Sequence, residues 1–470
     1  MPSILGANSA TGGYDVDNSV RFNDDDTAYM HKTPDGAGNR RTFTFSTWVK
    51  RANLGAEMGI FTAGADANAG QFFTIMFTAS DELDVQFYEG GFQDLTTSRV
   101  FRDVAAWYHI VVAVDTTQGT AANRIKVYVN GVQESSFDSS DYPGQNWDSA
   151  VNNTEIQQIG VRRNGSAALA GYYDGYLTET VLIDGSQLAA DKFGEFDSSS
   201  EIWKPKNVSG LTFGTNGFYL DFQASDNLGN DANGGTDLTE VNLAAIDQTT
   251  DTCTNNFCTI NFLDNYFSAS TFSEGNCKLV TQSTGYQYNT GTFGLTSGKW
   301  YYEMKMTNHS QADIVGIAGR VSGGSLHYLG YYADTWGYHS YDGKFKNNNS
   351  GTSYGDAWVT NDTIVGVYID LDNNKLYFSK NGTIQNSGTG ITIGAASSTF
   401  IGAYFPAIGD NWNGDTGTYH MNFGNPTYTG TDQTDVNGYG SFEYDPSSGS
   451  FDSASKDFLA ICTKNLAEFG

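Results

Sequence analysis

Positive charge is scarce in this sequence of 470 residues. It contains 25 lysines and arginines against 53 aspartates and glutamates, which gives a formal net charge of −28. A chain this acidic repels the phosphates of nucleic acids and anionic lipid head groups. We therefore expect no nucleic-acid partner.

Long apolar runs are also missing. A membrane-spanning helix needs about 20 apolar residues, whereas the apolar runs here are short, such as residues 110–114. The first residues, MPSILGANSATGG, lack a basic stretch followed by an apolar one, so we expect no signal peptide. The sequence therefore predicts no membrane insertion.

Cysteine and proline are rare, with 4 and 7 residues. Four cysteines in so long a chain exclude a disulfide scaffold. Cys253 and Cys258 have a spacing loosely like a zinc knuckle, but zinc needs four ligands and no second pair lies nearby. We expect structural or free thiols.

Glycine and aromatic residues are abundant instead. The chain has 55 glycines and 14% aromatic residues, while only 17% of its residues are charged. The aromatic content supplies sizeable cores and argues against disorder. Many glycines and aromatics with few lysines or glutamates are typical of an all-β protein with many turns.

The first half of the chain carries dense strand signals. Thr42–Val49 alternates polar with apolar residues, as a strand with one buried face does. Ile125–Val129 alternates likewise and ends at Asn130-Gly131. Because both turn residues tolerate positive φ, this dipeptide predicts a tight hairpin.

The second half repeats this pattern. Val365–Asp370 resembles Ile110–Asp115, since each is an apolar strand that ends in aspartate. Each is followed by a second strand and then by Asn-Gly, here at Asn381-Gly382. The simplest interpretation is two antiparallel β-sandwiches of one architecture.

An acidic stretch separates the two halves. From Asn207 to Cys277 there are nine acidic residues and no lysine or arginine. At the start of this stretch, Gly217–Phe222 is typical of a strand that completes the first sandwich. We predict four parts: a first sandwich at 1–222, an acidic connector at 223–260, a second sandwich at 261–428, and a loop-rich C-terminal segment at 429–470.

The first sandwich resembles the laminin-G-like, concanavalin A-like lectin/glucanase superfamily. The residues that carry the likeness are Phe43–Lys50, Trp107–Val112, Val127–Gly131 and Tyr173–Glu179. The second sandwich resembles a SPRY domain, through Gly298–Glu303, Val315–Ala318, Ile364–Asp370, Leu376–Gly382 and Met421–Gly424. These likenesses imply an all-β fold with two concanavalin-like jelly rolls in tandem. Since SPRY domains usually recognise proteins without catalysis, they also imply a binding function.

The order of these parts is similar to that in structural proteins of tailed, particularly marine, bacteriophages. The segments Phe218–Phe222, Asp251–Phe257 and Phe458–Leu466 add to the resemblance. It implies a virion protein, assembled in the host cytoplasm and then extracellular, in the form of a tail fibre, a head fibre or a decoration protein. The implied partners are other virion proteins and a host-surface glycan. We expect a homo-oligomer, with a trimer for a fibre.

Catalytic motifs are not apparent. The nearest approach to the glucanase pattern E-x-D-x-(x)-E is Glu195–Glu201, where the last acid lies too far along and three serines disfavour a strand. The sequence has no H-E-x-x-H, G-x-S-x-G or phosphate-loop motif. A Ser-His-Asp triad stays open, because its members need not be adjacent in sequence. We expect no catalytic residues and no enzymatic activity.

Calcium is the candidate ion. Oxygen-bearing residues gather at Asn23–Asp26 and in the stretch DNLGNDANGGTD, where the candidate ligands are Asp226, Asp231, Asn233 and Asp237. The spacing is not that of an EF-hand. The alternative interpretation is a solvated acidic loop.

Two aromatic stretches are candidates for ligand contact. One contains Tyr332 and Trp336, and the other is a loop tip with Asn411, Trp412 and Asn413. Aromatic faces stack on sugars and neighbouring amides bond their hydroxyls, although core packing is the alternative. The sequence thus predicts a non-enzymatic fibre for host-surface or glycan recognition. The alternatives are a capsid or tail decoration protein that binds virion subunits, and a secreted carbohydrate-binding or glycan-hydrolysing protein.

Overall fold

The computed structural model describes residues 13–66, 71–163, 168–264, 270–283, 285–321, 327–411, 414–452 and 456–470. The chain divides into two compact units, one ending at Thr254 and the other beginning at Asn255. We call residues 13–254 the N-terminal unit and residues 255–470 the C-terminal unit, and describe each separately.

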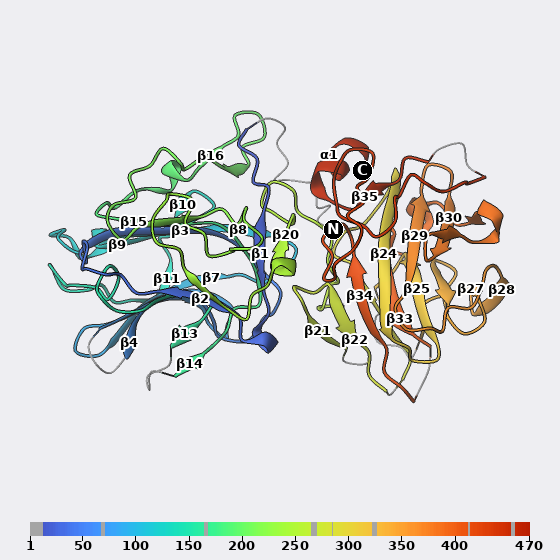
Figure 1. Cartoon of the computed structure of the whole chain (residues 1–470), viewed down its shortest axis with the longest axis horizontal. Helices are drawn as coiled ribbons and strands as arrows, with labels where there is room; N and C mark the ends of the chain where they lie inside the picture. Colours follow the sequence, from blue (N-terminus) through green and yellow to red (C-terminus); the bar gives the residue numbers. More distant parts are fainter. Residues whose placement is uncertain are drawn as a thin grey trace. The chain divides into compact units, whose positions relative to one another are not determined.

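The N-terminal unit is built from two antiparallel sheets that form two layers (Figure 1). The strand order in the first sheet is β10 (Val132–Gln133), β9 (Ile125–Val129), β8 (Trp107–Asp115), β3 (Thr42–Arg51), β15 (Gly175–Asp184), β1 (Ser19–Phe22) and β20 (Gln248–Thr249), with β18 (Phe218–Leu220) also on β15. The order in the second is β11 (Phe137–Ser140), β7 (Phe92–Val100), β6 (Glu82–Tyr88), β5 (Gln71–Phe77), β4 (Met58–Asp66), β12 (Gln157–Ile159), β2 (Tyr29–Lys32) and β19 (Thr239–Val241). Two hairpins flank them, β13 (Arg162–Arg163) with β14 (Leu169–Ala170), and β16 (Gly194–Phe196) with β17 (Trp203–Pro205).

The core of this unit lies between its two sheets. Phe43 and Phe45 alternate along β3 and are fully buried, and Phe45 stacks on Phe61 of the facing sheet with ring centroids 4.7 Å apart. The other face of the first sheet is covered as well, by a second cluster that contains Trp48 and Trp203. Since both faces are packed, the first sheet tolerates a polar residue only where it finds a partner.

The acidic segment belongs to the N-terminal unit as far as Thr254. Its strands β19 and β20 add to β2 and β1, one in each sheet. Asp251 lies fully buried, with Oδ2 2.8 Å from Lys50 Nζ and with Oδ1 accepting a 3.1 Å hydrogen bond from Trp107 Nε1. The segment 223–260 that we expected as a connector therefore divides between the two units, and most of it completes the edges of the first sandwich.

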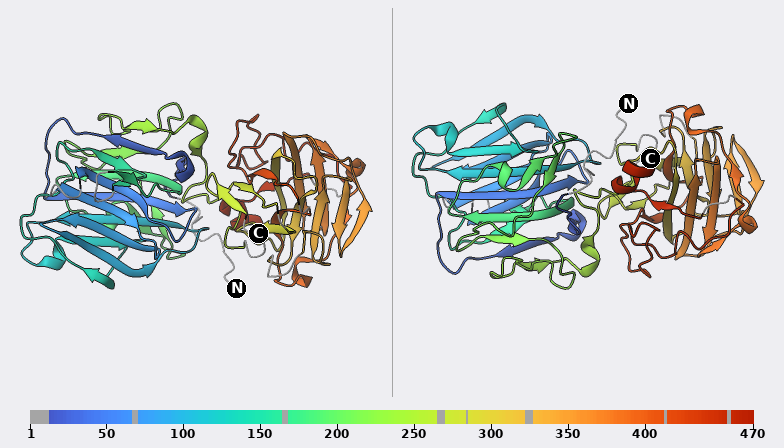
Figure 2. Two further views of the ribbon diagram at one scale, coloured as in Figure 1. Left: turned by 90° about the horizontal axis from the view of Figure 1, so that it is seen from below. Right: turned by 90° about the horizontal axis from the view of Figure 1, so that it is seen from above.

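The C-terminal unit also contains two sheets, seen from two sides in Figure 2. The order in the nine-stranded sheet is β21 (Thr271–Ser273), β22 (Lys278–Val280), β34 (Thr418–Asn422), β24 (Lys299–Asn308), β29 (Thr363–Asp370), β30 (Lys375–Lys380) and β31 (Thr383–Ile384), with β32 (Ile391–Thr392) on β30 and β35 (Leu459–Ala460) on β24. The order in the six-stranded sheet is β23 (Gln287–Thr290), β33 (Phe405–Asp410), β25 (Asp313–Ala318), β26 (Thr335–His339), β27 (Lys344–Asn347) and β28 (Ser350–Ser353). The helix α1 spans Thr463–Phe469.

The C-terminal segment covers the outer face of the nine-stranded sheet. The ring of Phe442 lies 5.0 Å from that of Tyr301 on β24, and the ring of Phe458 lies 5.2 Å from that of Tyr368 on β29. β35 continues the contact by pairing in parallel with β24. Side chains of this segment form a second hydrophobic layer on the sheet.

Both units contain the predicted Asn-Gly hairpin. Asn130-Gly131 and Asn381-Gly382 have positive φ at both residues, which joins β9 to β10 and β30 to β31 by two-residue turns. In each turn the asparagine Oδ1 accepts a backbone N–H from the strand paired with the hairpin, from His109 on β8 at 2.8 Å and from Ile364 on β29 at 2.9 Å. The shared turn supports a common architecture, and the all-β prediction of two sandwiches in tandem is confirmed.

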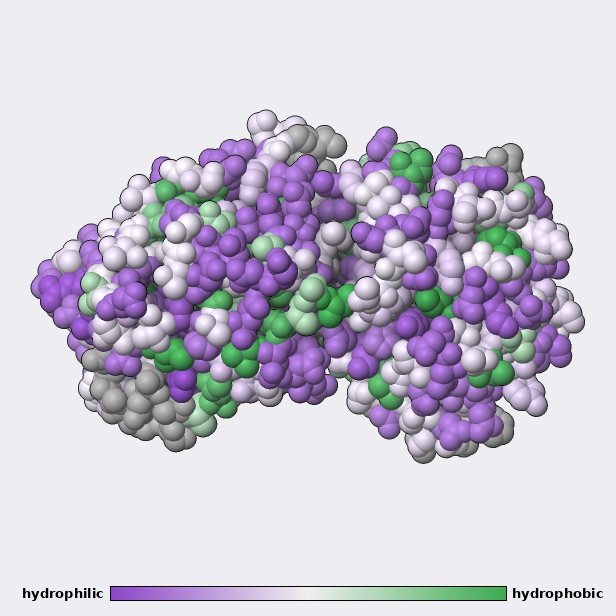
Figure 3. All heavy atoms as spheres, in the orientation of Figure 1, coloured by the Kyte–Doolittle hydropathy of each residue, from purple (hydrophilic) through white to green (hydrophobic). Residues whose placement is uncertain are grey.

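The surface is mainly polar, and hydrophobic side chains form only small spots on the face drawn in Figure 3. Among the described residues, no helix is long and apolar enough to cross a membrane. The four cysteines all lie within the described part and are buried thiols. Burial raises the pKa of the Cys462 thiol to about 12, so this thiol is unreactive at neutral pH.

Candidate functional site

The candidate site lies at one end of the six-stranded sheet, where three strands meet. β25 is hydrogen-bonded to both β26 and β33, and its last residue is opposite the first residue of each. The loops at this end carry Arg320 after β25, Asp334 before β26 and Phe400 before β33. The antiparallel register therefore brings together three side chains that are far apart in sequence.

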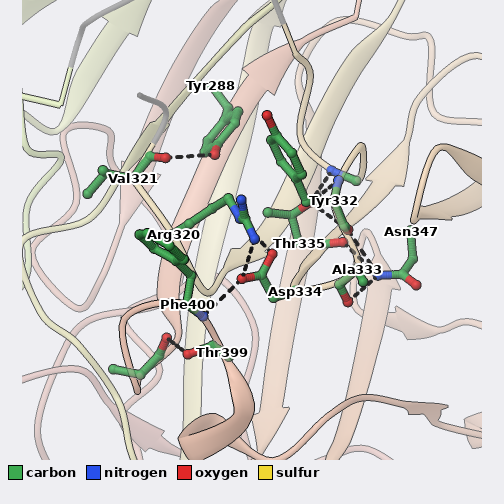
Figure 4. Close-up of polar contacts among 12 residues, drawn as sticks. Tyr288, Arg320, Val321, Tyr332, Ala333, Asp334, Thr335, Asn347, Thr399 and Phe400 are labelled. Atoms are coloured by element: carbon green, nitrogen blue, oxygen red, sulfur yellow. Dashed lines mark hydrogen bonds and ion pairs between the residues drawn. The ribbon is translucent and has the colours of Figure 1, made fainter. Parts of the chain in front are cut away.

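An ion pair forms the centre of the site. Arg320 donates from Nε to Asp334 Oδ1 at 2.7 Å and from Nη2 to Oδ2 at 3.0 Å, and Asp334 Oδ2 also accepts the backbone N–H of Phe400 at 3.1 Å (Figure 4). The guanidinium carbon lies 4.0 Å from the ring centroid of Tyr332 and 5.2 Å from that of Phe400. The bond to Asp334 raises the pKa of Arg320, so the guanidinium stays charged.

Neighbouring polar groups hold these loops in place. Asn347 Nδ2 donates to the carbonyls of Ala333 at 2.9 Å and Thr335 at 3.0 Å, which fixes the turn that carries Asp334 (Figure 4). A Cβ at Gly319 would lie 2.5 Å from Cβ of Thr399, so only glycine allows the Arg320 loop to approach the Phe400 loop this closely. These contacts hold the loops of Arg320, Asp334 and Phe400 in a fixed arrangement.

A pocket of about 400 Å³ opens beside the ion pair. Its lining combines the two charged side chains with small residues and aromatic rings: Arg320, Ala333, Asp334, Gly394, Ser398, Phe400 and Tyr404. Phe400 is 76% exposed, whereas Tyr404 is buried with its hydroxyl on the Gly394 carbonyl at 3.1 Å. An exposed ring next to fixed donors and acceptors can hold a polar ligand with an apolar face.

Only one of the described residues that the sequence predicted for ligand contact lies at this site. Tyr332 lies at the site, stacked on Arg320. Trp336 on β26 is only 9% exposed and packs near Phe345, so it presents little surface to a ligand. Asn411 is half-buried beyond the end of β33, at the opposite end of the sheet from Phe400. Trp412 and Asn413 lie outside the described residues.

Sequence reasoning missed Arg320, Asp334 and Phe400. A faint signal exists, because Arg320 is one of only 25 cationic residues and directly follows a buried strand. The partner of that cation depends on which strands are neighbours, which the sequence does not show.

The predicted calcium loop uses its carboxylates to fix its own backbone. Asp231 Oδ1 accepts the N–H groups of Tyr219 at 3.0 Å and Asn233 at 3.1 Å, and Asp237 Oδ1 accepts the N–H of Asp231 at 3.0 Å. Asp226 is exposed. In the described part of the chain, no three His, Cys, Asp or Glu side chains gather into a group that could hold a metal. Calcium at this loop stays a prediction.

Among the described residues, Ser46 and His109 form a serine–histidine pair, but its geometry does not fit nucleophilic catalysis. Ser46 Oγ lies 2.9 Å from His109 Nε2, and Trp203 Nε1 donates to His109 Nδ1 at 3.0 Å. Because an indole N–H only donates, Nδ1 accepts and the imidazole proton lies on Nε2, which donates to Ser46. This imidazole therefore cannot remove the serine proton as a triad base does. All three side chains are buried.

We predict that His109 stays neutral in mildly acidic solution. Its complete burial lowers the pKa to about 3, since desolvation disfavours the imidazolium. In NMR spectra of the whole chain, the His109 ring signals should not titrate between pH 8 and pH 4.5. The ring signals of the other histidines serve as the internal control. A midpoint near pH 6.5 for His109 would contradict this burial.

Two acidic runs among the described residues of the N-terminal unit come near the glucanase pattern. Asp197, in the predicted acid run, accepts from Ser199 and Ser200 and closes a turn. The run Glu82-Leu83-Asp84-Val85-Gln86 comes closer to the pattern, because Glu82, Asp84 and Gln86 alternate on one face of β6 opposite the core. Its third position is a glutamine, which cannot act as the acid/base. Asp84 is 2% exposed, and burial raises its pKa to about 7.

The N-terminal unit has a cavity of its own among the described residues. It measures about 360 Å³ and opens between β9–β10 and β11, with Lys126, Glu134, Phe137 and Tyr142 in its lining. The buried Glu134 carboxylate already accepts from Arg99 Nε at 2.7 Å. This cavity offers no exposed ring comparable with Phe400 in its described lining, so the pocket beside Arg320 is the better candidate.

Comparisons with known protein families agree with this architecture. Residues 24–185 match the model of the concanavalin A-like lectin/glucanases superfamily, and residues 299–426 match the model of the SPRY domain. Ran-binding protein 9 of Danio rerio and of Homo sapiens are each 31% identical to this chain over 87 residues, which is 18% of this chain. The matched stretch spans 14% and 12% of those two proteins.

Solved structures show further likenesses. A putative carbohydrate binding protein from Bacteroides ovatus is 15% identical, with 48% of this chain and 58% of that chain covered and a TM-score of 0.35. A human SPRY domain is 21% identical, with 31% of this chain and 91% of that chain covered and a TM-score of 0.24. The two family matches and the two sandwiches agree that this chain contains a concanavalin-like domain followed by a SPRY domain.

Proposed function

We propose that this chain is a non-catalytic binding protein of a tailed-phage particle, a tail fibre or head fibre whose C-terminal unit binds a host-surface glycan. The observation that carries the proposal is the pocket beside the Arg320–Asp334 pair, with the exposed ring of Phe400 at its mouth. A ring face stacks on the C–H surface of a sugar, while the paired guanidinium and carboxylate donate to and accept from its hydroxyls.

The virion part of the proposal is supported by the sequence. The order of a laminin-G-like block and a SPRY block, with Asp251–Phe257 between them and Phe458–Leu466 after them, resembles structural proteins of tailed phages. In a particle the chain would contact other virion proteins and form an oligomer, with a trimer as our expectation for a fibre. Several weak sites on one oligomer then bind together with high avidity.

The absence of catalysis is part of the proposal, and local chemistry supports it. His109 has its proton on the nitrogen that faces Ser46. Gln86 stands where a glycoside hydrolase of this pattern needs a carboxyl group. Neither His109 nor Gln86 can therefore supply the proton transfer that hydrolysis requires.

The test uses the whole chain on a glycan array and on host cells, together with two alanine variants. Phe400→Ala should weaken binding about tenfold, which corresponds to about 1.4 kcal/mol, because it removes the stacking face. Tyr341→Ala is the matched control, since Tyr341 is also an exposed aromatic residue, at 69%, but follows the opposite end of β26. It should change affinity by less than about twofold.

Equal affinities for the wild type and Phe400→Ala would place the binding site elsewhere. A chain that binds no glycan and no cell, yet attaches to particles that lack it, would overturn glycan recognition in favour of the decoration role. Release of reducing sugar from a bound glycan would overturn the absence of catalysis.

A further inference from the structure

Arg320, which lines the pocket, also lies over the first ring of a row of tyrosines. The ring of Tyr332 lies 5.2 Å from that of Tyr331, which lies 6.0 Å from that of Tyr328, which in turn lies 6.1 Å from that of Tyr286. We call these four tyrosines with Phe400 the aromatic strip. Phe400 and Tyr286 at its ends are 76% and 39% exposed, and the three rings between them are half-buried.

The four tyrosines of the strip come from two places in the chain. Tyr328, Tyr331 and Tyr332 lie in the connection that leads into β26, and Tyr286 directly precedes β23. The tyrosines are fixed by neighbours, since the ring of His327 stacks on that of Tyr331 at 3.7 Å and the Tyr328 hydroxyl donates to Asn349 Oδ1 at 2.8 Å. Fixed rings lose little entropy when a ligand binds.

The charges at the site are balanced. Arg320 and Asp334 neutralise each other in a bidentate pair. An anionic ligand would need an uncompensated cation, and the net charge of −28 on the chain opposes its approach. A cationic ligand would have to displace Arg320 from Asp334. A neutral ligand avoids both costs.

The pair still offers hydrogen bonds. A guanidinium has five N–H donors, and the bonds to Asp334 use Nε and Nη2, while Nη1 has no hydrogen-bond partner among the described residues. Asp334 contributes carboxylate lone pairs beside them. Adjacent hydroxyl groups, one accepting from Arg320 and one donating to Asp334, match this arrangement. A peptide side chain would favour an apolar anchor pocket or an unpaired charge.

We propose that the ligand of this site is a neutral glycan chain several sugars long. One sugar occupies the pocket against Phe400, and the following sugars lie along the aromatic strip towards Tyr286. Successive tyrosine rings of the strip lie 5.2 to 6.1 Å apart, so one extended ligand can contact several of them. This inference rests on the proposed glycan-binding function and adds the charge and the length of the glycan.

The test measures affinities of the whole chain for array glycans of one to six neutral hexose or N-acetylhexosamine units, with sialylated, sulfated and uronate glycans of matched length. Affinity should rise at least tenfold from disaccharides to tetrasaccharides. Tyr286→Ala should remove this gain without affecting the disaccharides, whereas Phe400→Ala should weaken every length. Tyr341→Ala should behave as the wild type, and the melting temperatures of all three variants report their folding.

Salt provides a second readout. Binding of a neutral ligand should change less than about twofold between 50 and 500 mM NaCl, because screening acts only on charged partners. Stronger binding of acidic glycans, or an affinity that depends neither on chain length nor on Tyr286, would overturn this inference. The proposed function would still hold in that case if Phe400→Ala weakened binding. Binding of peptides alone, or of no array glycan, would overturn both.

Discussion

Glu303→Ala is expected to lower the unfolding free energy of the C-terminal unit by about 3–5 kcal/mol. Glu303 lies in the middle of β24 and is fully buried. Its carboxylate accepts five hydrogen bonds, which come from Tyr301 OH, Asn422 Nδ2, Tyr428 OH and the backbone N–H groups of Glu443 and Tyr444. Alanine leaves these buried donors without an acceptor.

The effect should be concentrated in the C-terminal segment, because two of the five donors, the backbone N–H groups of Glu443 and Tyr444, belong to it and a third, Tyr428, directly precedes it. Urea unfolding measures the loss of stability, with the two units allowed separate transitions. Hydrogen exchange locates it, since the amides of Glu443 and Tyr444 should exchange faster in Glu303→Ala than in the wild type. Glu468→Ala, at an exposed position in α1, is the control and should stay within about 0.5 kcal/mol. Equal stabilities of the two variants would mean that Glu303 does not anchor the segment.

The strands themselves were largely predictable from alternation. The expected strand Thr42–Val49 corresponds to β3, Thr42–Arg51, and Ile125–Val129 is β9 residue for residue. Alternation works here because the apolar face of each strand meets the core between the sheets, although the polar face of β3 is buried as well. The Asn-Gly turns were predictable for a local reason too, since few other residues accept two successive positive φ angles.

The layer over β24 could not be predicted in this way. In Trp300–Met306, alternation places Tyr301, Glu303 and Lys305 on the polar side of the strand. In the structure, Tyr301 and Glu303 are fully buried, because the C-terminal segment covers that side. Local pattern does not reveal a partner that follows more than a hundred residues later. From alternation alone, Glu303 would be assigned to the surface.

The candidate site was predictable only in part, for the same reason. Tyr332 stands in a visibly aromatic stretch, so composition alone identified it. Arg320, Asp334 and Phe400 come together through the register of β25 with β26 and β33. A binding site made of loops at a sheet end depends on strand order, which composition does not contain.

The second large effect expected is a loss of stability of the N-terminal unit as pH rises, caused by Glu179. This residue lies at a bulge in β15 with φ of 49° and is 5% exposed. Its Oε1 accepts from the Tyr219 hydroxyl at 2.8 Å and from the Tyr14 hydroxyl at 3.4 Å, while Oε2 has no hydrogen-bond partner among the described residues. Burial, with a contribution from Asp221, raises the pKa to about 8.

The unfolding free energy changes with pH because the folded and unfolded states bind the Glu179 proton with different affinities. Between pH 4.5 and pH 8 the folded state keeps the Glu179 proton and the unfolded state releases it, so the free energy of unfolding falls as pH rises through this window. The stabilisation is complete below about pH 4.5 and is lost above about pH 8, and the total is about 3–5 kcal/mol. Asp84 adds a change of the same sign, because its pKa is about 7.

Glu179→Gln separates this group from the others. The amide is neutral at every pH, so the variant and the wild type should be equally stable near pH 5, and the variant should be the more stable by several kcal/mol near pH 9. Contributions of Asp84 and His109 are common to both proteins and cancel in the difference. Asp84→Asn is the matched control, since it should flatten its own part of the curve and leave the Glu179 difference unchanged. Parallel stability profiles for the wild type and Glu179→Gln would show that the carboxyl ionises in the folded state as easily as in the unfolded chain.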